Sequence, residues 1–428
     1  MRNWIAGYRG SNLARNAGWM LVGQGLCLCI QAAYFVIIAR SLGSQQYGAF
    51  IATVALTQIL SPFVGFGGSN LLVRSVARNR QAFPVYWGNL LFMTLASGTA
   101  AAVLVVGVAR LVLPASIPMV VIVLVSVAEL NFSRLADCAG MAFQSIERLD
   151  VMAQLTIWAA LARLIGISLL AAIVHHPVAT HWAFVYLLTT VVGAVLGLAW
   201  VQTVIGSPRL ELGRIGGEFI EGFYFSAGLS AQTIYNDIDK TMLARMATLD
   251  AVGIYGAAYR LIEVAFIPVK SLLNAAYPGF FRAGQDGVRG TLTYMRRMLP
   301  KSVCYSLLAF FCLLLGAPVV PHVLGPQYAR SVEALRWLAP LPLLKTIHYF
   351  MADTLSCAGH QGPRALIQVM VAGFNVLVNL WIIPAYSWRG AAWSSLASDA
   401  LLAVSMYLAV LALSGRTVPA VTASEPAL

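Results

Sequence analysis

Long apolar stretches follow one another along almost the whole chain of 428 residues, separated by short polar segments. Hydrophobic residues make up 59% of the sequence and charged residues only 10%. About 20 mostly apolar residues in a helix cross the hydrocarbon core of a bilayer, and a helix satisfies its own backbone hydrogen bonds in lipid. The sequence therefore predicts an all-α polytopic membrane protein in which spanning helices make up nearly the entire molecule.

The hydropathy pattern predicts twelve spanning helices in two bundles of six. The first bundle lies within residues 1–210 and the second within residues 211–428. The predicted spans cover residues 16–39, 48–72, 85–109, 117–142, 151–174, 181–205, 219–244, 252–278, 299–320, 332–357, 364–384 and 390–413. Because the number of spans is even, both termini are expected on the same side of the membrane.

Basic residues are distributed unevenly between the loops that these spans define. Lys and Arg number 28 against 16 Asp and Glu, which gives a formal net charge of +12. The richer set of loops includes both chain ends and the longest predicted loop, residues 279–298. Cytoplasmic loops collect Lys and Arg, so we expect this set and both termini in the cytoplasm. No basic cluster lies on a soluble module, which argues against a nucleic-acid partner.

The loops on the other side are predicted to be short, which restricts the function. Loops of about ten residues or fewer leave no room for an extracytoplasmic catalytic domain, so we do not expect an enzyme. The six cysteines lie in apolar stretches and form no CxxC or zinc pattern. The sequence therefore predicts no metal site and no cofactor, and a coupling ion would be H⁺ or Na⁺.

The two halves resemble each other at a constant offset of 205 residues. In each half an Ala-Arg pair ends one span, and a Gly eight residues after the Arg opens the next. The matching pairs are Gly23 and Gly228, Ala39-Arg40 and Ala244-Arg245, Gly48 and Gly253, Ala52 and Ala257, and Leu56 and Leu261. Each half has six spans, so the repeat is parallel. Such repeats are typical of transporters that carry a substrate between their halves by rocking.

Ionisable residues inside predicted spans are candidates for function, because a charge at bilayer depth is costly. The seventh span carries Asn236, Asp237, Asp239 and Lys240. Lys240 follows Asp237 by three residues, so the two side chains share a helix face and can pair. Asp239 points nearly opposite and needs a partner from elsewhere. This group is either a pair that fixes helix packing or a cavity-facing site for a substrate or a proton.

The eighth span carries one long polar stripe. Arg260, Glu263, Ile267, Lys270 and Asn274 fall at i, i+3, i+7, i+10 and i+14, on one face of a helix. A stripe of this length cannot face lipid. A water-filled cavity is favoured over a dry helix interface, because several charges of both signs are difficult to satisfy in a dry interface.

Other spans contain fewer ionisable residues. The fourth span has Glu129, Ser133 and Asp137 at i, i+4 and i+8. These residues are either functional groups inside the membrane or part of a helix that extends into water on the cytoplasmic side. More isolated charges lie in the fifth, tenth and twelfth spans, and a structural role is favoured for each: Arg163, Lys345, Asp353 and Asp399.

Several segments together resemble one known family. Residues 15–78 contain RNAGWMLVGQG, ARSLGSQQYGAF and GFGGSNLLVRSVAR, which resemble the opening of Wzx-type polysaccharide exporters. NDIDKTMLARMATLDAVGIYGAAYRL (236–261) resembles the start of their second half. FQSIERLD (143–150) and NVLVNLWIIPAYSWRGAAWSS (375–395) resemble their loop after the fourth span and their last helix pair. The match covers essentially the whole chain in the right order.

This resemblance implies a fold similar to multidrug-and-toxin exporters (MATE) and lipid II flippases. It also implies a flippase of a bacterial inner membrane that moves an undecaprenyl-pyrophosphate-linked oligosaccharide from the cytoplasmic to the outer leaflet. Membrane lipids, a polysaccharide polymerase and a chain-length regulator are the implied partners. In such a protein, Arg and Lys would neutralise the pyrophosphate. The substrate-binding candidates are Arg260, Lys270, Lys240, Arg163 and Arg15, and the candidate coupling carboxylates are Asp237, Asp239 and Glu263.

Three other functions compete with this interpretation. A cation-coupled multidrug antiporter of the same fold is disfavoured because its cavity would carry carboxylates with few basic groups. Lipid II flippases usually have two further spans, so O-antigen or exopolysaccharide repeat units are the better prediction. A membrane polysaccharide polymerase or ligase would need a sizeable outer loop. His175, His176 and His181, near one short outer turn, are interpreted as interface residues.

Overall fold

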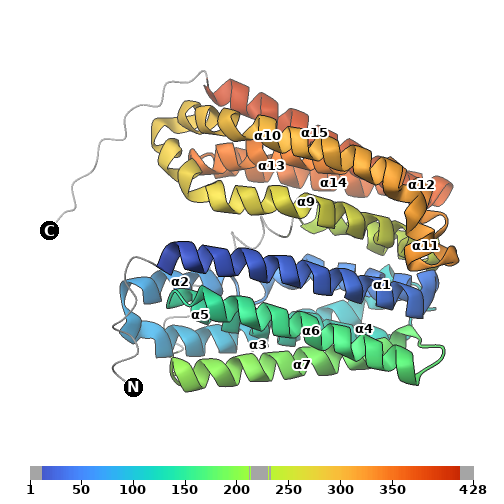
Figure 1. Cartoon of the computed structure of the whole chain (residues 1–428), viewed down its shortest axis with the longest axis horizontal. Coiled ribbons are helices and arrows are strands. Elements are labelled where there is room, and N and C mark those ends of the chain that lie inside the picture. The colour runs from blue at the N-terminus through green and yellow to red at the C-terminus, as the bar shows by residue number, and fades with distance from the viewer. Residues whose placement is uncertain (1–11, 212, 214–229, 231–232, 415–428) are drawn as a thin grey trace.

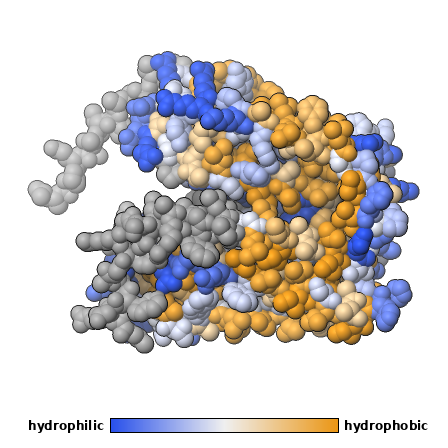
Figure 2. Space-filling model, viewed as in Figure 1, coloured by the Kyte–Doolittle hydropathy of each residue, from blue (hydrophilic) through white to orange (hydrophobic). Residues whose placement is uncertain are grey.

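The computed structural model describes residues 12–211, 213, 230 and 233–414. Within these ranges the chain folds into helices and contains no strand. The helices form two bundles that lie side by side, one from α1 to α7 and one from α9 to α15 (Figure 1). A broad hydrophobic belt separates hydrophilic ends on the visible face of the molecule (Figure 2). The all-α membrane fold predicted from hydropathy is confirmed.

The first bundle begins with one long kinked helix. Gly43 has φ 70° and ψ 171°, so the chain turns there and the two parts of this helix correspond to the first two predicted spans. Glycine tolerates this left-handed φ because it has no Cβ. The helices are α1 (Asn12–Leu60), α2 (Gly68–Arg78), α3 (Phe83–Val112), α4 (Met119–Val127), α5 (Arg134–Ser145), α6 (Leu149–Ile173) and α7 (Ala179–Val204), and a π-helical segment (Ala128–Ser133) joins α4 to α5.

The second bundle begins with a helix over residues 233–246. A break at residues 247–248 follows it, 205 positions after the Gly43 kink, so the repeat found in the sequence recurs in the backbone. The remaining helices are α9 (Leu249–Ala283), α10 (Gly287–Gly316), α11 (Val320–Leu324), α12 (Ser331–Leu338), α13 (Leu341–Cys357), α14 (Gln361–Tyr386) and α15 (Trp388–Ser414).

Nine segments of the described chain are long and apolar enough to cross a membrane. One of them, Gly25–Phe63, joins the first two predicted spans across the kink. The tenth predicted span is divided between α12 and α13, whose lengths are 8 and 17 residues. The seventh, 219–244, lies partly outside the described residues. Once the joined pair of spans, the divided span and the partly described span are each assigned, the helices correspond to six predicted spans in each half.

Two predicted boundaries are wrong. The second span does not continue to residue 72, because Pro62 lies in a short 3₁₀ turn and Gly65 and Gly67 have positive φ, so the chain turns before α2. The predicted loop 279–298 is mostly helix, since only Gly284–Asp286 separates α9 from α10. Hydropathy identifies the residues that prefer the hydrocarbon core, but it does not show where a helix ends. The basic residues of this segment remain helical outside that core.

The two bundles meet along α1 and α9, and their contacts concentrate at the end where the Gly43 kink lies (Figure 1). Ser44 donates a hydrogen bond to Asp250 across the interface. Tyr328 Oη donates to the backbone oxygen of Ala39 at 3.3 Å, and Arg40 donates to that of His322 at 2.8 Å. An apolar core extends across this end from one bundle to the other. The halves are therefore closed together at the end predicted to be outside.

Candidate functional site

A polar cavity of about 360 Å³ lies between the two bundles, beside the closed end. Its walls come from α1, α6 and α7 of the first bundle and from α9 and the helix at 233–246 of the second. Five of the candidate residues predicted from the sequence line it together: Arg163, Asp237, Lys240, Arg260 and Glu263. The polar faces of the seventh and eighth spans thus meet at one cavity, as the stripe on the eighth span predicted.

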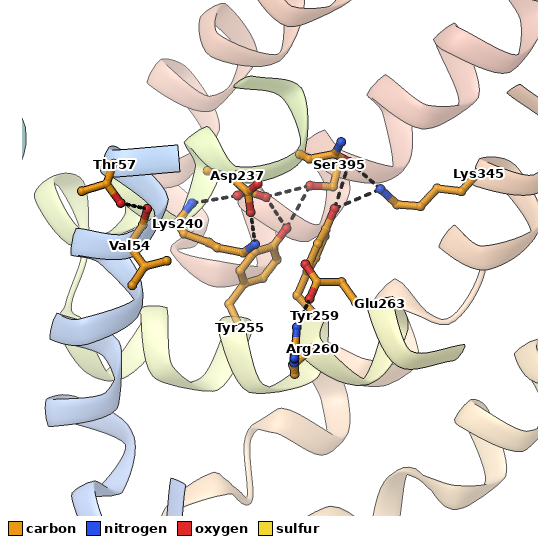
Figure 3. A network of polar contacts seen from close by, with 12 residues as sticks. Val54, Thr57, Asp237, Lys240, Tyr255, Tyr259, Arg260, Glu263, Lys345 and Ser395 are labelled. Carbon is orange, nitrogen blue, oxygen red and sulfur yellow. Dashed lines mark hydrogen bonds and ion pairs between the residues drawn. The ribbon is translucent and has the colours of Figure 1, made fainter. Parts of the chain in front are cut away.

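Lys240 and Asp237 form the predicted pair on the helix at 233–246 (Figure 3). The Lys240 side chain is only 8% exposed, and its Nζ also lies 4.2 Å from the centre of the Tyr259 ring. A carboxylate and an aromatic face together compensate an ammonium group removed from water. Lys240 is therefore largely satisfied within the protein.

Lys345 of α13 extends its amine toward Tyr259 in the same network (Figure 3). Its Nζ donates to Asn236 Oδ1 at 2.5 Å and to Tyr259 Oη at 3.1 Å. Lys345 is buried, so these contacts come from inside the second bundle. This agrees with the structural role predicted for Lys345.

Asp239 does not line any of the cavities described here. Its carboxylate is buried and accepts hydrogen bonds from Tyr255 Oη, from Ser395 Oγ at 3.0 Å and from the backbone N–H of Lys240 at 2.7 Å. Tyr255 and Ser395, from α9 and α15, are the partners that the sequence could not identify. The carboxylate ties three helices of the second bundle together.

Arg260 connects the bundles across the cavity. One guanidinium nitrogen donates to Glu263 Oε2 at 3.0 Å, and the other donates to Gln31 Oε1 of α1 at 3.1 Å. The Arg260 and Glu263 side chains are 37% and 41% exposed, so both remain accessible from the cavity. Arg260 and Glu263 therefore pair within the stripe, and Arg260 adds a contact to the other half.

Arg163 of α6 faces Arg260 from the first bundle. Its guanidinium lies 5.0 Å from the centre of the Tyr186 ring, and it makes no hydrogen bond or ion pair with any described residue. Tyr186 donates its hydroxyl to Glu129, which also accepts from Gln58 Nε2 at 2.9 Å. Glu129 is held in the π-helical segment, a distortion frequent at functional sites. Arg163 is thus a cation without a paired carboxylate.

A larger cavity of about 590 Å³ adjoins the first, within the first bundle. Tyr34, Arg163 and Arg260 line both cavities, so the two arginines stand where the cavities meet. The fourth-span residues Ser133 and Asp137 also line the larger cavity, and Asp137 pairs with Arg134 at 3.2 Å.

Lys270 and Asn274, the lower part of the polar stripe, line a third cavity of about 320 Å³ between α1, α6 and α9, which shares Gln31, Met152 and Thr156 with the larger cavity. Lys270, a substrate-binding candidate, therefore does not line the central cavity with Arg260. The stripe is too long for one cavity, because ten residues of helix extend about 15 Å. Arg15 belongs to α1, and its side chain lies outside the described part of the structure.

Sequence reasoning missed two polar residues of the site: Gln58, which lines the central cavity, and Gln31, which lines the larger cavity and accepts from Arg260. The repeat contained a signal for both. Gln31 corresponds to Asn236 at the offset of 205, and Gln58 corresponds to Glu263. Mapping the polar positions of the second half onto the first would have found them.

Comparison with known proteins identifies the family. The sequence profile described as "Polysaccharide biosynthesis protein" matches residues 13–283, more than half of the chain. No curated protein sequence matches. A lipid II flippase, MurJ, in an inward closed conformation has a TM-score of 0.75 at 9% identity, covering 92% of this chain and 87% of that one.

Two structures of a multidrug resistance MATE family transporter of the MOP superfamily are also similar. The inward-facing one has a TM-score of 0.69 at 13% identity and covers 93% of this chain and 100% of that one. The outward-facing one has a TM-score of 0.65 at 13% identity, covering 94% and 96%. At these identities the structures establish the MATE-like fold, and the sequence profile establishes the family: the chain belongs to the polysaccharide biosynthesis protein family.

Proposed function

We propose that this protein moves an undecaprenyl-pyrophosphate-linked oligosaccharide repeat unit, of O-antigen or exopolysaccharide, from the cytoplasmic to the outer leaflet of a bacterial inner membrane. Its family and its lipid II flippase-like fold support a flippase role. Both termini would be cytoplasmic in this orientation. The described chain is consistent with that, since α1 begins and α15 ends at the same end of the molecule (Figure 1).

The observation that carries the proposal is the unpaired Arg163 opposite Arg260. A pyrophosphate that crosses the hydrocarbon region needs cations and hydrogen-bond donors in place of water. Lys240 is occupied by Asp237, and Arg260 shares its donors between Glu263 and Gln31, whereas Arg163 has no competing carboxylate pair. A guanidinium also binds phosphate oxygens in a bidentate manner, which an ammonium cannot do.

The position of the site between the bundles fits a rocking mechanism. The halves are joined at the Gly43 end, and the cavities lie between and within them toward the opposite end. Rocking of one half against the other would expose the same arginines first to one leaflet and then to the other. The polyprenyl tail would remain in lipid, and the oligosaccharide would pass to a polymerase and a chain-length regulator on the outer side.

Gene deletion in a strain without a redundant exporter tests the proposal. We expect surface polysaccharide to be lost and lipid-linked repeat units to accumulate on the inner leaflet. Arg163→Gln should fail to restore export although the protein inserts normally. Arg245→Gln, at an exposed position on the closed end, is the matched control and should restore it. Persistence of surface polysaccharide in the deletion strain would refute the proposed function.

A further inference from the structure

We propose that the cavity of about 590 Å³ inside the first bundle binds the glycan of the substrate through its hydroxyl groups. This inference rests on the proposed function and deepens it, because it assigns the sugars to one half of a duplicated fold. The pyrophosphate would lie at the junction with the central cavity, between Arg163 and Arg260.

The wall of this cavity is rich in hydrogen-bond acceptors. Thr156 Oγ1 donates to the backbone oxygen of Met152 at 3.0 Å, and Thr189 and Thr190 donate to that of Tyr186 at 3.0 and 2.7 Å. Each threonine hydrogen is thus used inside its own helix, while the oxygen keeps lone pairs for another donor. Sugars carry many hydroxyl donors, which match such a wall.

The positive charges of this cavity lie at the end where the pyrophosphate would bind. Arg163 and Arg260 stand at one end, where it meets the central cavity, and Asp137 lines another part of its wall. An anionic pyrophosphate is attracted to the arginine end. The side chain of Asp137 is 59% exposed and its charge is compensated by Arg134, so its free carboxylate lone pairs add acceptors for sugar hydroxyls.

Small residues make the room for this pocket. Gly140, Gly193 and Gly197 line it, together with alanines of α5 and α6. A Cβ atom added to Gly193 would meet no atom within 4 Å, so a larger side chain there would extend into open space. The volume lies within the ~300–1,000 Å³ typical of ligand sites. Gly193 therefore offers a way to fill the pocket without disturbing helix packing.

Binding measurements on the detergent-purified full chain test the inference. The two probes are undecaprenyl pyrophosphate and undecaprenyl pyrophosphate bearing a neutral disaccharide. We expect the disaccharide carrier to bind wild type more tightly than the bare carrier. Gly193→Leu should weaken disaccharide-carrier binding by about tenfold, equivalent to one or two hydrogen bonds, and leave bare-carrier binding unchanged. Gly107→Leu, an open and exposed glycine of α3, is the control.

A second pair of variants keeps volume constant. Thr190→Val removes an acceptor from the pocket, and Thr203→Val removes the same group from an exposed position on the same helix. Only Thr190→Val should weaken disaccharide-carrier binding. Equal binding of the two probes to wild type, or an unchanged preference for the disaccharide in both Gly193→Leu and Thr190→Val, would overturn the glycan pocket and leave the flippase proposal intact. Failure of both probes to bind wild type would overturn both.

Discussion

Gly48 of α1 and Gly253 of α9 are equivalent positions of the two halves, and each packs against the backbone of the other's helix. A Cβ atom on Gly48 would lie 1.9 Å from the backbone oxygen of Leu249, and one on Gly253 would lie 1.9 Å from that of Ser44. Ser44 and Leu249 are themselves 205 residues apart. The contact is therefore reciprocal, as expected at a two-fold axis between duplicated halves, and it closes one end of the molecule.

Gly253→Ala should open this end. The added methyl group cannot fit against Ser44, and backbone atoms on both sides prevent a cheap local adjustment. We expect the halves to separate there. Cysteines at positions 44 and 250, in a background without the native cysteines, should cross-link efficiently with a short thiol reagent, since the natural side chains are hydrogen bonded. Adding Gly253→Ala should reduce the yield several-fold, whereas Gly107→Ala should not. An unchanged yield would show that the glycine contact does not hold the end closed.

Sequence reasoning predicted interactions that lie within one helix and missed those between helices. The Lys240–Asp237 pair was predicted from its three-residue spacing and forms, and Arg260 and Glu263, predicted to share a helix face, also pair. The Asp239–Ser395 hydrogen bond joins residues 156 positions apart, and no local pattern contains it. Arg163 was interpreted mainly as a structural residue, because its position opposite Arg260 depends on how α6 packs against α1.

Helix ends were predicted well only where hydropathy and helix formation change together. The last two helices end within a few residues of the predictions, at Tyr386 and Ser414. The start of α10 was misplaced because its first turns are polar and yet helical. The break after Leu60 was missed because Phe63, Val64 and Phe66 keep the average hydropathy high across Pro62 and the glycines that follow it.

Glu129→Gln should tighten the binding of undecaprenyl pyrophosphate. The glutamine keeps one oxygen to accept from Tyr186, and its NH₂ group can donate to Gln58 Oε1 once that amide turns over, so the local packing is expected to persist. The negative charge that partly offsets Arg163 is lost, and an anion at Arg163 then experiences a stronger positive potential. We expect a several-fold lower Kd and slower export, because release becomes harder. A weaker or unchanged affinity in the folded variant would contradict this role for Glu129.

Asp239→Leu should destabilise the second bundle. The substitution leaves the hydroxyls of Tyr255 and Ser395 with only each other as partners, so one buried hydroxyl hydrogen and the freed lone pairs lose their partner. Each unsatisfied polar group costs about 1–3 kcal/mol, so thermal unfolding in detergent should occur at a clearly lower temperature. Asp239→Asn retains an acceptor oxygen and should lose less. If the two variants unfold at the same temperature, the hydrogen bonds of Asp239 do not account for its role.

Lys240 and Asp237 should show strong energetic coupling in a double-mutant cycle. Asp237→Leu alone leaves a nearly buried ammonium without its carboxylate, and breaking a buried pair in this way costs about 3–5 kcal/mol. Replacing both partners, as Lys240→Met with Asp237→Leu, removes the uncompensated charge and should recover most of that loss. Thermal unfolding in detergent measures the stability terms, and transport assays run in parallel separate stability from function. Additive losses in the double variant would mean that the pair is not a unit, and Lys240 would then regain its place as a cation available to the substrate.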